Sequence, residues 1–185
     1  MTRAQAAQMF YNLLLDQEVE ITVTFQDVPE DAWYAQAVNT LASLGILNGV
    51  KDGQFAPNRS ITRAEFAAIA MRLANPVPEG SNPFSDVQEG DWFYDLVVGA
   101  RSYGWITGYK DGTFRPNSTI TRAEAATLVN RMLARTADTA YVDANGDSLR
   151  QFPDVKQSDW FYYAVMEAAN AHDYTKTDSG EVWGA

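Results

Sequence analysis

The sequence predicts a mainly α-helical protein built from internal repeats, with short loops or hairpins and little or no sheet. Two recurring blocks predict this class. One is Ile-Thr-Arg-Ala-Glu, found at 61–65 and 120–124, with the variant Met-Thr-Arg-Ala-Gln at 1–5. The other is Phe-x-Asp-Val, found at 25–28, 84–87 and 152–155, each with a Trp eight positions after the Phe. Self-similarity at a fixed period is typical of repeat architectures.

Each Thr-Arg-Ala block predicts the start of a helix. Thr followed three residues later by Glu or Gln is a capping box, in which each side chain satisfies a backbone N–H of the first turn. Apolar residues then recur at helical spacing, and small alanines would let three such helices approach closely. The stripes are Ala6, Met9, Phe10 and Leu13, then Phe66, Ile69, Ala70 and Leu73, then Ala125, Leu128, Val129 and Met132.

The arginine of each block is not explained by capping. A cation in the first helical turn opposes the helix dipole. Its recurrence as Arg3, Arg63 and Arg122 indicates that these side chains face something negative. A helix N-terminus beside a guanidinium group could hold a carboxylate or phosphate.

Three Trp-led segments predict further helices, with Asp residues as N-caps. They are Asp31–Leu44, Asp91–Tyr103 and Asp159–Ala171. Gly45 and Gly104 follow the first two as helix terminators, and His172 takes that place in the third. Their tryptophans, Trp33, Trp92 and Trp160, are interpreted as structural anchors, with sugar platforms as the alternative.

A Gly-rich loop separates the Trp-led helix from the Thr-led helix in residues 45–58 and 104–117. The pairs Asp52-Gly53 and Asp111-Gly112 predict tight turns. The Pro-rich segment 75–82 is expected to be a stiff linker, and the acidic segment 137–151 a solvated loop. The domains that follow are a C-terminal half-repeat at 1–20, full repeats at 25–75 and 84–136, and an N-terminal half-repeat at 152–185. The two halves would form a third unit if the chain ends meet.

The composition limits the classes of function. A net charge of −10 and a pI of about 4.4 exclude general nucleic-acid binding, which needs a basic surface. The absence of cysteine excludes disulfides, zinc-thiolate sites and thiol nucleophiles. No apolar run is long enough to insert in a membrane, and no signal peptide opens the chain. We therefore expect a piece of a longer, exported protein.

Together these motifs resemble the S-layer homology (SLH) domain family. The resemblance implies a pseudo-threefold assembly of three SLH repeats around a central three-helix bundle formed by the Thr-Arg-Ala-Glu helices. It also implies non-covalent anchoring of exported bacterial proteins to cell-wall polysaccharide, often to pyruvylated sugars held in grooves between repeats. Gln5 departs from the motif, and the loop 171–183 has lost most of the glycine pattern.

Several residues are candidates for binding the sugar. The arginines would pair with an anionic substituent, or else form salt bridges between repeats with Asp27, Asp86 or Asp154. The glycines would admit a ligand or shape a turn, the lysines would add charge or be solvated, and the aromatic rings would stack on sugar or fill the core. The acidic residues would bond backbone N–H groups and contribute to the groove. The full set is Arg3, Arg63, Arg122, Gly49, Gly108, Lys51, Lys110, Trp105, Tyr109, Asp27 and Asp86.

A calcium loop is the one cofactor that the sequence raises. Asp143, Asn145, Asp147 and Asp154 occupy the first, third, fifth and twelfth places of such a loop. Ser148 replaces the glycine of the sixth place, so a solvated acidic loop without metal is the preferred interpretation.

The predicted function is non-catalytic anchoring to anionic secondary cell-wall polysaccharide at the bacterial cell surface. No catalytic residues are expected, because no Ser nucleophile elbow, zinc motif or phosphate loop is present, and the carboxylates of note repeat with structural spacing. A protein-binding or surface-layer self-assembly module is the alternative, and a glycan hydrolase is the third class. Self-association is left open.

Overall fold

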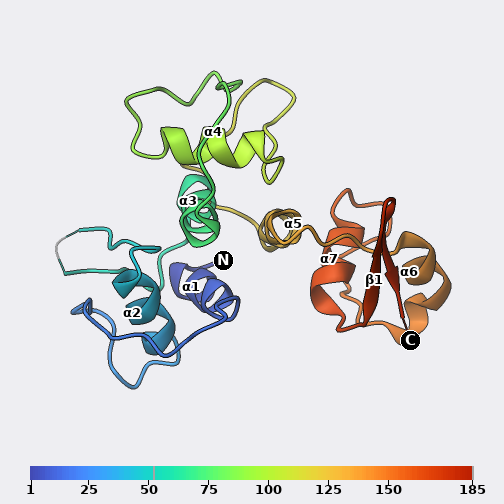
Figure 1. Cartoon of the computed structure of the whole chain (residues 1–185), viewed down its shortest axis with the longest axis horizontal. Helices are drawn as coiled ribbons and strands as arrows, with labels where there is room; N and C mark the ends of the chain where they lie inside the picture. Colours follow the sequence, from blue (N-terminus) through green and yellow to red (C-terminus); the bar gives the residue numbers. More distant parts are fainter. Residues whose placement is uncertain (52, 185) are drawn as a thin grey trace. The chain divides into compact units, whose positions relative to one another are not determined.

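The computed structural model describes residues 1–51 and 53–184 and is mainly helical, as predicted. Its α-helices are α1 (Arg3–Tyr11), α2 (Ala35–Ser43), α3 (Arg63–Ala74), α4 (Tyr94–Ser102), α5 (Arg122–Met132), α6 (Thr139–Asn145) and α7 (Tyr162–Ala169) (Figure 1). Strands β1 (Tyr174–Thr177) and β2 (Gly180–Trp183) form an antiparallel hairpin. The chain divides into two compact units, Met1–Ile120 and Thr121–Ala185. Within the described residues, no helix is both long and apolar enough to cross a bilayer.

The three Thr-led helices begin where the capping motif predicts. Thr2, Thr62 and Thr121 are the N-caps of α1, α3 and α5, and all three capping boxes are complete. Gln5 serves as well as Glu, since its Oε1 accepts the Thr2 N–H at 3.0 Å. The prediction that these blocks start helices is confirmed.

The Trp-led helices are shorter than predicted, and Asp does not cap them. Helices α2, α4 and α7 begin two residues after the Trp, and their N-caps make no side-chain hydrogen bond. Asp91 and Asp159 instead accept the N–H groups of Gln88 and Lys156, at 2.7 and 2.8 Å, in the turn that precedes the helix. These two aspartates therefore stabilise the turn before the helix and do not cap the helix itself. The prediction that Asp residues cap the Trp-led helices was wrong.

The tryptophans of these segments are not buried anchors. Trp33, Trp92 and Trp160 are 62%, 60% and 70% exposed. Each ring contacts the next aromatic residue edge-on, as Trp92 does with Phe93 at 5.3 Å between ring centroids. The following residue, Phe93, is the buried one. The anchor interpretation was wrong because the Trp precedes the helix and lies off its apolar stripe.

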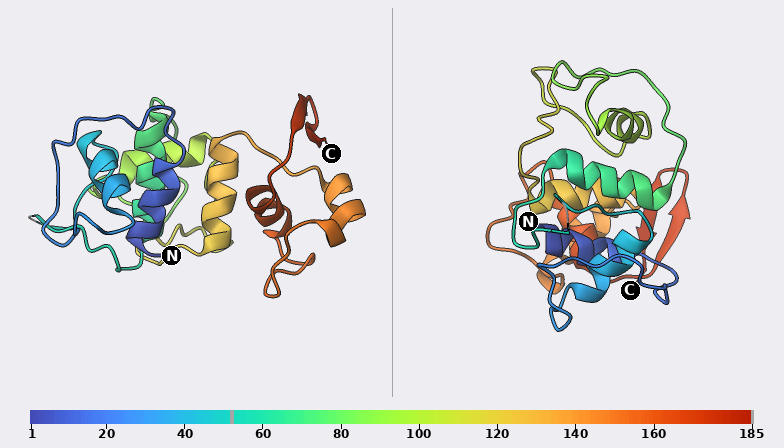
Figure 2. Two further views of the ribbon diagram at one scale, coloured as in Figure 1. Left: turned by 90° about the horizontal axis from the view of Figure 1, so that it is seen from below. Right: turned by 90° about the vertical axis from the view of Figure 1, so that its left-hand side faces the viewer.

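The helices that pack together come from two successive sequence repeats and not from one. In the first unit α1 packs on α2, and α3 packs on α4; in the second unit α5 packs on α7 (Figures 1 and 2). Each Thr-led helix thus packs on the Trp-led helix that follows it in the chain. Helices α1 and α3 also touch, with the Phe10 and Phe66 ring centroids 4.9 Å apart. The central three-helix bundle, and the pairing of residues 1–20 with 152–185, involve both units and stay predictions.

The start of each Thr-led helix in the first unit binds the Gly-rich loop of the next repeat. First-turn N–H groups have no partner inside a helix. In α1 those of Arg3 and Ala4 donate to the carbonyls of Arg59 and Pro57, at 2.9 and 3.0 Å. In α3 those of Arg63 and Ala64 donate to Ser118 and Pro116 at the same distances. These N–H groups are therefore satisfied by protein and are not available to an anion.

Asp27 holds the same loop from the other side. Its carboxylate accepts the N–H groups of Phe55 and Ala56 at 2.8 and 2.7 Å, and Asp86 does the same for Phe114 and Arg115 in the next repeat. Ala56 and Arg115 both have a φ of 59°, a left-handed conformation that side chains disfavour. The two bonds from each aspartate offset this strain, so Asp27 and Asp86 are structural residues.

The turn glycines Gly53 and Gly112 have positive φ angles of 67° and 78°. At Gly112 the N–H donates to Tyr109 O at 3.0 Å, which confirms the tight turn predicted there. Residue 52 lies outside the described residues, and with it part of the other predicted turn.

The second unit departs most from the predicted pattern. Segment 137–151 was expected to be a loop but contains α6 and a 3₁₀ turn, Gly146–Ser148. Val142 of α6 is buried with Met166 and Trp183. Asp138 caps α6 by accepting the Tyr141 N–H at 3.0 Å. The acidic residues Asp138, Asp143 and Asp147 of this segment had favoured a solvated loop over a helix.

The four residues of the calcium alternative lie on α6, in the 3₁₀ turn and in the segment before α7. Asp143 and Asn145 lie on the helix, where residues two apart point to different faces. Asp143 accepts hydrogen bonds from Tyr163 and Gln157, both at 2.9 Å. Asp147 lies in the 3₁₀ turn and Asp154 in the segment before α7. The alternating spacing of a calcium loop is therefore not formed by these four residues.

Gly49 and Gly108 are predicted to tolerate no side chain. A Cβ at Gly49 would lie 2.6 Å from Gln54 O and 2.8 Å from a Phe25 ring carbon; at Gly108 it would lie 2.5 Å from a Phe84 ring carbon and 2.7 Å from Thr113 O. Gly49→Ala and Gly108→Ala should each lower the free energy of unfolding by about 1–3 kcal/mol, through overpacking. Urea unfolding measures this. Gly90→Ala is the matched control, because nothing lies within 4 Å of its Cβ; equal stability of all three variants would contradict the prediction.

Asp27 is predicted to make the first unit acid-sensitive. Burial alone would raise the pKa of its carboxyl, but the N–H groups of Phe55 and Ala56 outweigh burial and lower the pKa below 3.8. A lowered pKa in the folded state gives stability that is present above the unfolded-state pKa and lost as pH falls through the folded-state pKa. Asp27→Asn should cost about 1–3 kcal/mol at pH 7, and this difference should shrink at pH 2–3. The exposed Asp31→Asn is the control, and a gap independent of pH would refute the assignment.

Candidate functional site

A cavity of about 450 Å³ opens at the surface of the first unit. Loop residues Leu47–Val50 form one wall, and α3 contributes Glu65, Ile69 and Arg72. The remaining lining residues are Arg3, Arg59 and Trp92. The cavity is therefore built by three successive sequence segments: the first half-repeat, the second repeat and the Trp turn of the third.

Arg3 lines this cavity, and each nitrogen of its guanidinium group makes a hydrogen bond. Its Nε donates to Phe55 O at 2.8 Å, and Nη2 donates to Asn48 O at 2.6 Å. Nη1 pairs with Glu65 Oε1 at 3.0 Å, and the guanidinium lies 4.6 Å from the Phe55 ring centroid. Burial lowers the pKa of Arg3, and the carboxylate of Glu65 acts in the opposite direction.

The negative group predicted to face Arg3 is therefore supplied by the protein itself, as the Glu65 carboxylate and two backbone carbonyls. Arg3 does form a salt bridge between repeats, but its acidic partner is Glu65 of the next capping box, which was not among Asp27, Asp86 and Asp154. Nothing in the sequence assigned Glu65 as the partner of Arg3, because the capping box already accounts for a glutamate at this position. Arg3 thus fixes Asn48 and Phe55, which lie on either side of the Gly-rich turn.

Two further arginines in the cavity were not among the sequence candidates. Arg59 Nη2 pairs with Glu65, and its side chain is 43% exposed. Arg72 is half-buried on α3, and burial lowers its pKa. Within residues 1–51 and 53–184, no hydrogen bond or ion pair engages the Arg72 guanidinium. Neither Arg59 nor Arg72 recurs at the matching position of every repeat, so the repeat pattern does not single them out.

The cavity has the electrostatics of an anion site. Among the described residues, three guanidinium groups line it against one carboxylate, in a protein whose net charge is −10. The exposed indole of Trp92 adds a flat apolar face. Gly49 lies in the wall, where its missing side chain makes room for Gln54 O and the Phe25 ring. Lys51 is exposed and lies outside the lining.

The corresponding position in the next repeat is more filled. Arg63 Nε donates to Phe114 O at 2.9 Å, and its guanidinium lies 5.0 Å from the Tyr109 ring centroid. Arg115 stacks on the same ring at 3.9 Å. Tyr109 replaces Val50 of the first site, so this ring and its arginines occupy space that the smaller residue leaves open.

The other candidates of this repeat divide between core and surface. Trp105 is 9% exposed and packs beside Tyr103 at 5.4 Å, which is a core position. Gly108 is packed against Phe84. Lys110 is exposed.

Arg122 is exposed at the start of α5 in the second unit. Within the described part of the chain, no hydrogen bond or ion pair engages its side chain. The hairpin β1–β2 occupies the sequence position where the other repeats have the Gly-rich loop. The backbone carbonyls that fix Arg3 and Arg63 have no counterpart there in the sequence pattern.

The cavity lining does not resemble a hydrolase site. Glycosidases use two carboxylates on either side of the bond that they cleave. Among the described residues that line the cavity, Glu65 is the one carboxylate, and Arg3 and Arg59 both pair with it. The lining offers cations for a negative group and an indole face beside them.

The sequence profile of the S-layer homology domain (SLH) matches residues 24–67 and 83–126. Cell surface glycoprotein 1 of Acetivibrio thermocellus is 34% identical over 97% of this chain and 8% of its own length. The cellulosome-anchoring protein of the same organism is 33% identical over 97% of this chain and 41% of its own length. An amylopullulanase of Thermoanaerobacterium thermosulfurigenes is 38% identical over 81% of this chain.

The chain spans less than half the length of each of these relatives. The match to the amylopullulanase covers 8% of that protein, so the likeness does not extend the enzyme's activity to this chain. What the relatives share with it is the repeated segment. With two tandem matches and all three Thr-led helix starts capped as the repeat requires, this chain belongs to the S-layer homology domain family.

Proposed function

We propose that the chain is a non-catalytic module that anchors its parent protein to the bacterial cell wall outside the cell. The cavity of the first unit binds a negatively charged substituent of the secondary cell-wall polysaccharide, such as a pyruvyl carboxylate. The printed name of one relative describes an anchoring protein, which supports the class of function. The chemistry of the cavity supports the ligand.

The observation that carries the proposal is Arg72. Its guanidinium is half-buried in the cavity wall, and within the described residues no carboxylate or carbonyl pairs with it. Burying a charge without a partner costs free energy, and its lowered pKa reflects that cost. An anionic ligand would supply the missing partner. Arg59, which is partly exposed at the rim, would reinforce it.

The shape of the lining supports a sugar over a free anion. Trp92 presents an exposed indole to the cavity, and Leu47, Val50 and Ile69 add apolar surface. Sugar rings carry apolar C–H faces that pack on indoles. A carboxylate on the sugar would then reach the arginines while the ring lies against Trp92.

Arg72→Gln and Trp92→Ala are predicted to weaken binding to purified cell-wall sacculi. Losing one charge-assisted hydrogen bond costs about 1.5–3 kcal/mol, so Arg72→Gln should raise the Kd about tenfold or more. Co-sedimentation with sacculi measures this, and circular dichroism should be unchanged. Arg101→Gln, which removes an exposed arginine outside the cavity, is the control. If Arg72→Gln and Trp92→Ala both bind like the wild type, the cavity is not the site.

Removal of the polysaccharide separates the competing functions. The anchor should bind intact sacculi and lose binding once the wall polysaccharide is extracted. Binding that survives extraction, together with self-association in sedimentation velocity, would favour a self-assembly module instead. Turnover of a glycan substrate would favour a hydrolase.

Arg63 and Arg122 are predicted to respond differently. Arg63 is buried and bonds Phe114 O, so Arg63→Ala should lower stability by about 2–4 kcal/mol as well as weaken binding. Arg122 is exposed, so Arg122→Ala should weaken binding to sacculi without a change in Tm. Thermal unfolding alongside co-sedimentation tests both. Unchanged binding by Arg122→Ala would remove that residue from the binding set.

A further inference from the structure

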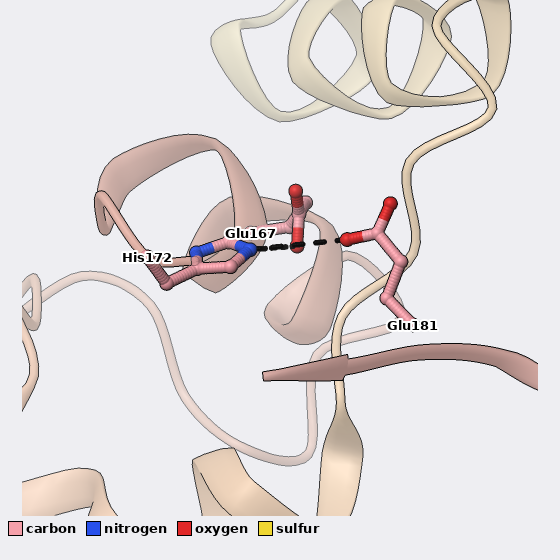
Figure 3. A group of neighbouring side chains, drawn as sticks. All are labelled: Glu167, His172 and Glu181. Carbon is pink, nitrogen blue, oxygen red and sulfur yellow. Dashed lines mark ion pairs between the residues drawn. The ribbon is translucent and has the colours of Figure 1, made fainter. Parts of the chain in front are cut away.

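A second cluster of charged groups is buried in the second unit, away from any role described above. Glu167 on α7, His172 just after it and Glu181 on β2 point toward one another (Figure 3). Their side chains are 3%, 6% and 1% exposed. One potential ligand atom from each lies within 4.8 Å of the others.

In the tautomer that His172 adopts, the Nε2 lone pair points into the cluster. Its Nδ1 lies 2.8 Å from the backbone oxygen of Asn170, which can only accept, so Nδ1 carries the proton. Nε2 is then the unprotonated nitrogen. The ring is fixed by stacking on Trp183, with centroids 3.7 Å apart. A backbone carbonyl bonded to the second nitrogen is the usual way in which a metal-binding histidine is oriented.

Both nitrogen–oxygen distances in the cluster are longer than a hydrogen bond, and the shorter one matches the separation of two ligands of one zinc ion. His172 Nε2 lies 3.4 Å from Glu167 Oε2 and 3.8 Å from Glu181 Oε2. A charge-assisted N–H···O bond would be about 2.7–2.9 Å. Ligands about 2.0–2.2 Å from a tetrahedral zinc ion are separated by about 3.3–3.6 Å.

Two carboxylate oxygens in the cluster make no hydrogen bond within the described residues. They are Glu167 Oε2 and Glu181 Oε2, and both are buried. The other oxygen of each carboxylate pairs with Arg135, at 2.9 Å for Glu167 and 2.8 Å for Glu181. One guanidinium thus serves two carboxylates, and the two Oε2 atoms both turn toward His172.

Arg135 is the competitor for this position. Its Nη2 donates to His172 Nε2 at 2.9 Å, so an ion bound there must displace that contact. The Arg135 side chain is 25% exposed and lies over the Tyr174 ring at 4.0 Å from its centroid. The same Nη2 pairs with Glu167 Oε1, so binding of an ion requires this end of the guanidinium group to move.

We propose that Glu167, His172 and Glu181 form a binding site for a divalent metal ion of the zinc type, which ties the β1–β2 hairpin to α7. One imidazole and two carboxylates suit Zn²⁺ or Co²⁺, whereas Ca²⁺ and Mg²⁺ prefer oxygen ligands alone. A fourth position would be left for water. The site is independent of the cavity in the first unit and of sugar binding.

Titration of the full chain with Zn²⁺ and Co²⁺ tests the proposal. Calorimetry should show one Zn²⁺ per chain, saturating Zn²⁺ should raise Tm by about 5 °C or more, and Co²⁺ should give the visible absorption of a low-coordinate nitrogen and oxygen site. His172→Gln and Glu181→Gln should each weaken Zn²⁺ binding at least about tenfold. Ca²⁺ and Mg²⁺ should give no shift.

Two further variants keep the test decisive. Asp178→Asn removes an exposed carboxylate of the same hairpin and should bind Zn²⁺ like the wild type. Arg135→Gln removes the competing cation and should bind Zn²⁺ more tightly, even if it lowers the Tm of the metal-free protein. Absence of Zn²⁺ binding by the wild type, or equal binding by the His172→Gln variant, would overturn the proposal.

Discussion

The rest of the first unit depends on one contact: the first turn of a Thr-led helix bonded to the Gly-rich loop of the next repeat. Backbone N–H groups of Arg3 and Ala4 bond the loop carbonyls, and the Arg3 guanidinium bonds two more. Asp27 fixes the loop from the other side. This contact satisfies a helix end, orders a loop with a left-handed residue and shapes the cavity wall at once.

The same contact explains why a cation is placed where the helix dipole disfavours it. Arg3 gains two carbonyl oxygens and the Glu65 carboxylate, which together outweigh the few tenths of a kcal/mol lost to the dipole. Glu65 in turn belongs to the capping box of α3. Successive repeats are therefore linked through side chains that each serve two neighbours.

Local signals predicted the local structure well, and failed where the partner is distant in the chain. The helix starts at Thr2, Thr62 and Thr121 follow from three-residue spacing, which sequence displays directly. The partner of Arg3 lies 62 residues away, and nothing in the spacing singles out Glu65. Arg72 was missed as a cavity residue for the same reason, and Trp92 was considered as a sugar platform only as the alternative to a structural anchor. Helix α6 was missed because its burial depends on Met166 and Trp183, which come later in the chain.

The offset between sequence repeat and packing pair has a consequence for how such modules evolve. Because the cavity draws on the end of one repeat, the whole of the next and the opening turn of a third, a solitary copy could not make it. Duplication of one repeat in the gene adds a boundary between two repeats. The proposed ligand-binding cavity forms at such a boundary and not within a single repeat. Selection can then diversify one boundary, as Val50 and Tyr109 have diverged, while the helices on either side stay alike.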